Sequence, residues 1–132
     1  MIQEAEKRAY NDLTADILNL EPGILSCVII SDPQGSVLAR AAKPEFQHFG
    51  NLQGNTEGMA GHWALLAFNA MKRLDPARSK VKYISIGRED HKTLLSPVNF
   101  RGADLMIIMA VKFGNESTEI HNKIIKLLEG RA

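Results

Sequence analysis

The sequence contains a single cysteine, Cys27, and this scarcity excludes two kinds of structure. An internal disulfide needs two cysteines, and a zinc site built on cysteine needs more than one. Cys27 stands inside an apolar run, so we expect it to be a small buried hydrophobic residue.

Long apolar runs are missing as well. No stretch approaches the roughly 18 consecutive apolar residues that a membrane span requires, so we expect no membrane insertion. The first six residues include two acids and no hydrophobic segment of signal-peptide length. The expected location is therefore the cytoplasm.

Neither sign of charge is in excess, because 16 basic residues face 15 acidic ones and the formal net charge is +1. Such a chain has no basic surplus to attract phosphate backbones, which argues against nucleic acid as a partner. Its 132 residues are 45% hydrophobic and 23% charged, as in an ordinary globular protein. We expect one folded domain spanning residues 1–132.

The hydrophobic pattern predicts a fold of mixed helices and strands, of the α/β (α+β) class. Helices are predicted from Ala5 to Leu20, from Glu57 to Leu74 and from Asn115 onward, where Asn115 is the expected N-cap. Strands are predicted over 24–30, 36–42, 81–87, 92–96 and 104–113, with 43–55 as an irregular connection and Pro97 as the end of the fourth strand. The order α-β-β-α-β-β-β-α predicts a five-stranded, mainly antiparallel sheet with helices on both faces.

The second predicted helix carries more apolar surface than the other two. At about 100° per residue, its polar residues His62, Asn69 and Arg73 gather on one side, and the apolar residues sweep roughly 200° of arc. A helix that lies on a sheet with its back in water needs a stripe only somewhat wider than about 100°. Either this helix is deeply buried in its own domain, or half of the arc packs on a second subunit in a two-fold pairing. Trp63, Met59 and Met71 would suit such an interface.

Residue patterns for catalysis and cofactor binding are weak. The four histidines, His48, His62, His91 and His121, are expected to be solvated, and no spacing among them predicts a metal site. The segment 50–55 is rich in glycine but lacks the lysine and the Ser/Thr pair of a phosphate-binding loop. No nucleophile elbow and no cysteine–histidine arrangement is visible. We therefore expect no catalytic residues, no metal and no cofactor.

The chain resembles the Roadblock/dynein-light-chain family, whose domains are related to the longin and profilin-like folds. The resemblance lies in Pro22-Gly23-Ile24-Leu25, in the strand–turn–strand segment from Ile30 to Leu38, in Leu94-Leu95-Ser96-Pro97 and in the apolar strand from Leu105 to Val111. It spans nearly the whole chain. The connection 43–55 departs from the tighter arrangement expected of the family.

The resemblance implies a non-enzymatic adaptor or regulator that scaffolds protein partners, a small GTPase or a related complex among them. It also implies homodimers or heterodimers joined through the second helix and the third strand, and a homodimer is our expectation. The implied interface comprises Met59, Trp63, Leu66, Ala67, Ala70 and Met71 of the helix with Val81 and Tyr83 of the strand.

Two other classes of protein remain open. One is a small-molecule sensor of the PAS, GAF or profilin-like type, which would hold its ligand in a cavity lined by Tyr83, Phe113 or Trp63. The other is an enzyme whose site no sequence motif reveals.

Overall fold

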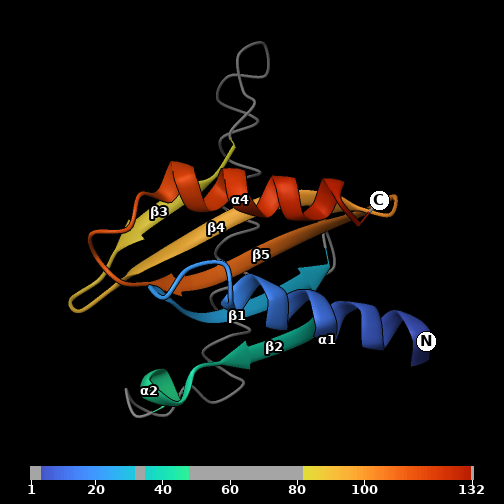
Figure 1. The fold of residues 1–132 in the computed structure, drawn as a ribbon, viewed down its shortest axis with the longest axis horizontal. Coiled ribbons are helices and arrows are strands. Elements are labelled where there is room, and N and C mark those ends of the chain that lie inside the picture. Colours follow the sequence, from blue (N-terminus) through green and yellow to red (C-terminus); the bar gives the residue numbers. More distant parts are fainter. Residues whose placement is uncertain (1–3, 32–34, 48–81, 132) are drawn as a thin grey trace.

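The computed structural model describes residues 4–31, 35–47 and 82–131. Within these ranges lie three helices and five strands (Figure 1): α1 (Glu4–Leu18), β1 (Ile24–Ser31), β2 (Val37–Ala42), α2 (Pro44–Gln47), β3 (Ile84–Gly87), β4 (Lys92–Phe100), β5 (Ala103–Val111) and α4 (Ser117–Glu129). The helix predicted from Glu57 to Leu74 lies outside the described residues.

The five strands form one sheet in the order β2-β1-β5-β4-β3. Every pairing in it is antiparallel. The predicted five-stranded sheet is thereby confirmed, with β1, β5 and β4 as its inner strands and β2 and β3 at its edges.

Strands β1 and β5 are mostly apolar because both of their faces are buried. On one face lies a cluster to which β1 contributes Cys27 and Ile29, and β5 contributes Leu105, Ile107, Met109 and Val111. On the other face Val28, Ile30, Leu95, Met106 and Ile108 form a second cluster. The prediction that Cys27 is buried is confirmed.

Helices α1 and α4 cover the first face side by side (Figure 1). Leu13 and Ile17 of α1 are fully buried, four residues apart, so they point to the same side of the helix. Ile120, Ile124 and Leu128 repeat this spacing on α4. Two ion pairs link the helices near the end of α1. Asp16 of α1 pairs with Arg131, which follows α4, and Glu21, which follows α1, pairs with Lys123 in the middle of α4.

Helix α2 lies on the second face, where Phe46 packs with Leu25 and Ala110. Helices are therefore present on both faces of the sheet. The sequence predicted an irregular connection over 43–55, and this was wrong for Pro44–Gln47. One helical turn is too short to leave a periodic pattern in the sequence.

Strand β4 continues through Pro97 to Phe100, although the sequence predicted that it would end at the proline. Strand β3 pairs with β4 only from Lys92 to Leu95. At Pro97 no described strand borders that side of β4, so the missing N–H removes no bond of the sheet. Met106 of β5, the residue that pairs with Pro97, lies on the other side of β4.

Helix α4 begins at Ser117, and its N-cap is Glu116 rather than the predicted Asn115. The side chain of Asn115 donates instead to the carbonyl of Lys112, at 3.3 Å. Asn115 therefore stabilises the turn before the helix.

Short connections join β1 to β2 and β3 to β4. Gly35 has a φ of 73° in the β1–β2 connection, a conformation that favours glycine. The backbone N–H of Arg88 donates to the carbonyl of His91 at 2.8 Å and closes the β3–β4 turn. The third strand begins later than predicted, at Ile84, and Val81 lies outside the described residues.

Candidate interaction surface at the β3 edge

Strand β3 forms one edge of the sheet and is only four residues long. Its inner side pairs with β4, and no described strand borders its outer side. Ser85, Ile86 and Gly87 are exposed, and Ile86 keeps 44% of its surface accessible. An exposed strand edge offers backbone N–H and C=O groups to a further strand. A β-branched apolar side chain accompanies them here.

The two sides of the β3 segment face different surroundings. Ile84 packs against the cluster on the second face of the sheet, and Ile86 lies on the same face because side chains alternate along a strand. Tyr83 and Ser85 point toward α4, where the Tyr83 hydroxyl is hydrogen-bonded to the Thr118 hydroxyl. The Ser85 hydroxyl lies 3.4 Å from that of Ser117. The edge is therefore attached to the first turn of α4.

His121 lies one turn further along α4 and faces the sheet. Only 6% of the residue is exposed, and its Nδ1 lies 3.1 Å from the Oγ of the fully buried Ser96 on β4. The Tyr83 ring packs at 5.5 Å from the imidazole. Burial, and in second place the positive charge of Lys82, lower the pKa of His121.

The prediction that His121 is solvated was wrong. The spacing to Ile124 and Leu128 is three and then four residues, so the sequence did place His121 on the buried stripe of the helix. The polar character of the imidazole outweighed that signal.

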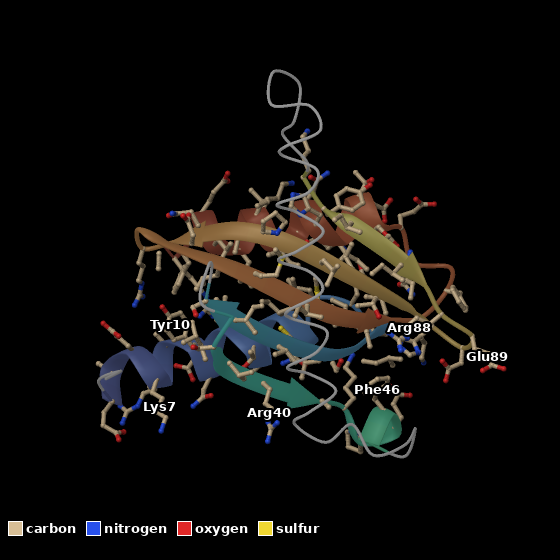
Figure 2. The ribbon with its side chains drawn as sticks, turned by 180° about the vertical axis from the view of Figure 1, so that it is seen from behind. Lys7, Tyr10, Arg40, Phe46, Arg88 and Glu89 are labelled. Carbon is tan, nitrogen blue, oxygen red and sulfur yellow. The ribbon has the colours of Figure 1, made fainter. Side chains whose placement is uncertain are left out.

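Strand β2 forms the opposite edge. Its first residue, Val37, keeps 44% of its surface accessible, the same fraction as Ile86. Arg40 projects from the exposed side of the strand (Figure 2). The two edges thus present β-branched side chains of equal exposure, and these make a matched pair for experiments.

The β3–β4 turn carries charged residues and is held at its base by an aromatic contact. Arg88 and Glu89 extend from the tip of the hairpin (Figure 2). The Nδ1–H of His91 donates to the Asp90 carboxylate at 2.6 Å, and this hydrogen bond is the first cause that lowers the pKa of Asp90. The buried Phe46 of α2 meets the His91 ring edge-on at 5.5 Å. The turn is thereby tied to the second face of the sheet.

Of the eight predicted interface residues, only Tyr83 belongs to the described part of the chain. Met59, Trp63, Leu66, Ala67, Ala70, Met71 and Val81 lie outside it. Tyr83 precedes β3 and packs on His121 beside the candidate edge.

The residues considered for a sensor pocket do not converge in the described structure. Phe113 lies at the surface with 54% of its area exposed, and Tyr83 packs on His121. Trp63 lies outside the described residues.

Among residues 4–31, 35–47 and 82–131, no group of three or more His, Cys, Asp or Glu side chains could hold a metal ion. No helix in these same ranges is both long and apolar enough to cross a membrane. His48 and His62 lie outside them.

An antiparallel sheet in the order β2-β1-β5-β4-β3, with the terminal helices together on one face, has the architecture of a Roadblock/LC7 domain. The predicted resemblance is confirmed for the fold. The Roadblock/LC7 domain from Streptomyces avermitilis is 11% identical and superposes with a TM-score of 0.65, covering 91% of this chain and 92% of that one.

Two structures of the protein MglB are similar to the same extent. MglB from Myxococcus xanthus is 8% identical with a TM-score of 0.66, and 100% of this chain and 96% of that chain are covered. A structure of MglB with a tetrameric arrangement is 10% identical, with the same TM-score and the same coverage. No protein-family model matches the sequence, and no curated protein matches it.

Proposed function

We propose that this chain is a non-enzymatic adaptor or regulator that works as a homodimer and scaffolds protein partners, a small GTPase or a related complex among them. The proposed pairing surface joins the β3 edge to the segment that contains Met59, Trp63, Leu66, Ala67, Ala70, Met71 and Val81. Tyr83 belongs to this surface through its position at the start of β3.

The observation that carries this proposal is the β3 edge, whose outer side no strand of the described residues borders. A short strand with an exposed Ile86 can pair with the same strand of a second copy, and the two sheets then become one. The fold shared with Roadblock/LC7 domains supports the proposal, and the tetrameric arrangement of an MglB structure supports self-association in this fold.

Substitution of Ile86 by arginine tests the pairing surface. Pairing along β3 would bury two unpaired cations, one from each subunit, and burial of an unpaired charge costs several kcal/mol. We expect the dissociation constant of the dimer to rise by about 100-fold, or ~2.7 kcal/mol. Light scattering after size-exclusion chromatography measures the mass.

Val37→Arg is the matched control, because Val37 has the same exposure on the opposite edge. This variant is expected to keep the mass of the wild type. If Val37→Arg dissociates the dimer and Ile86→Arg does not, the pairing surface lies at β2 and the proposed surface is wrong.

The proposed partner class requires a separate experiment. The chain is immobilised, and purified small GTPases of the same organism are offered in the presence of GTP or GDP analogues. We expect capture of one of them to change with the nucleotide, since switch regions of GTPases order around the γ-phosphate. Capture that is equal with both analogues would support a constitutive scaffold and would contradict nucleotide-dependent regulation.

The cytoplasm is the proposed location. Cys27 is a free thiol in the middle of the sheet, and a lone thiol suits a reducing compartment.

A further inference from the structure

Beneath the first turns of α4, His121 places an ionisable ring in a nearly closed site. Its Nδ1 is hydrogen-bonded at 3.1 Å to Ser96, whose side chain is completely buried on β4. In the sheet, Ser96 pairs with Ile107 of β5. A neutral imidazole suits this environment, whereas an imidazolium brings an uncompensated charge into it.

Among residues 4–31, 35–47 and 82–131, no carboxylate acts on His121 to balance such a charge. From the segment before β3 come the phenol of Tyr83 and the cation of Lys82. From β4 the same face of the sheet presents Leu94, Ser96 and Val98, none of which is charged. From α4 itself, Thr118 is occupied by the Tyr83 hydroxyl. Within the described part of the chain, the charged group that acts on His121 is Lys82, which has the same sign as a protonated histidine.

We propose that His121, Ser96 and Tyr83 form a pH-sensitive latch that fastens the first half of α4 to β4 and to the start of the edge strand β3. The neutral ring keeps the latch closed near neutral pH. Protonation opens it, because the charged ring is more stable in water than between α4 and the sheet.

The direction of the pH dependence follows from the lowered pKa of His121 in the folded chain. Above the ordinary value of 6.5 both the folded and the unfolded chain hold the ring neutral, and the latch contributes its full stability. As the pH falls below that value, the unfolded or opened chain takes up the proton first. Stability is therefore lost from pH 6.5 downward, until the folded form is protonated as well.

The latch bears on pairing because Tyr83 leads directly into β3. Opening of α4 would release Tyr83 and the edge strand together, so acidification is expected to weaken a dimer that pairs along β3. This consequence rests on the proposed function, whereas the latch itself does not.

The latch is tested on the full-length wild type by NMR, with the His121 ring and the backbone amides of α4 followed from about pH 7.5 to about pH 5.5. We expect the ring to titrate below its ordinary value, and the amides of residues 117–122 to shift with the same midpoint. Lys82→Gln removes the neighbouring cation and should move both midpoints upward. A ring that titrates at the ordinary value, or amides that do not follow it, would overturn the proposal.

The variant His121→Gln supplies a second measurement. Between the same two pH values, the unfolding equilibrium constant of the wild type should rise several-fold more than that of this variant. Should His121→Gln fail to fold, the ring titrations of the wild type and of Lys82→Gln decide alone.

Masses measured by light scattering at the two pH values separate the latch from the pairing. A dimer whose mass falls with the midpoint of the His121 titration supports both the latch and its link to pairing. A dimer of constant mass while α4 opens disproves only the link between them. A monomer at both values contradicts the proposed function, and the NMR titration still judges the latch.

Discussion

Gly23 and Asn115 come together between β1 and α4, although 92 positions separate them in the sequence. A Cβ on Gly23 would lie 2.1 Å from the Asn115 Nδ2, far inside contact distance. Asn115 uses this nitrogen to donate to the carbonyl of Lys112. The backbone of Gly23 accepts a bond from the Lys112 N–H at 2.8 Å. The glycine is needed here for space, since its φ is not among the positive ones.

Gly23→Ala is expected to lower the free energy of unfolding by about 1 kcal/mol, because the new methyl group displaces the Asn115 amide from its acceptor. Urea denaturation measures the loss. In an Asn115→Ala background the same substitution should cost much less, since the amide is already absent. Equal costs in both backgrounds would contradict this explanation.

Cys27 and His121 illustrate what single residues allowed the sequence to predict. Cys27 lies in a mostly apolar segment on a strand buried on both faces, so its position was predictable, and burial raises the pKa of its thiol far above the ordinary value. His121 is also buried, but a polar side chain can occupy such a position only with a partner. That partner, Ser96, lies 25 residues away in the sequence and could not be identified from it.

The β4–β5 hairpin stores a small strain at its tip. Arg101 and Gly102 both have positive φ values, 54° and 83°, as a two-residue turn of the mirror-image type requires. An arginine is unfavourable in this conformation, whereas asparagine is common there. The guanidinium of Arg101 lies over the Phe100 ring, 4.9 Å from its centroid, and this contact offsets part of the strain.

Arg101→Asn is expected to raise the free energy of unfolding by about 0.5 kcal/mol, because relief of the strain exceeds the loss of the ring contact. Gly102→Ala, at the second position of the same turn, should lower it by about 1 kcal/mol. Thermal unfolding of both variants beside the wild type provides the comparison. A loss of stability in Arg101→Asn would mean that the cation contact is worth more than the strain.

Elements were predictable where burial alone determines them. Strands β1 and β5 are mostly apolar, and α1 and α4 repeat apolar residues every three to four positions. The errors occurred where a particular neighbouring strand or hydrogen-bond acceptor decides. Pro97 stays inside β4 because β3 is short, and Asn115 leaves the helix cap because the carbonyl of Lys112 is within reach.

The first and last helices, α1 and α4, lie on one face of the sheet. The two edges of the sheet differ in character. At the β2 edge α1 packs nearby, whereas the β3 edge is attached to α4 by hydroxyl contacts. The fold was predictable from the order of the elements. The prediction of one domain over 1–132 and the predicted interface at 59–71 stay predictions, because an apolar arc does not reveal whether its own chain or another covers it.

Sedimentation equilibrium of the wild type near neutral pH, over a wide range of concentration, tests the proposed pairing most directly. The account predicts a mass of twice 14.6 kDa at all but the lowest concentrations. A single mass of 14.6 kDa at the highest concentration would contradict it, because β3 would then remain an open edge in solution.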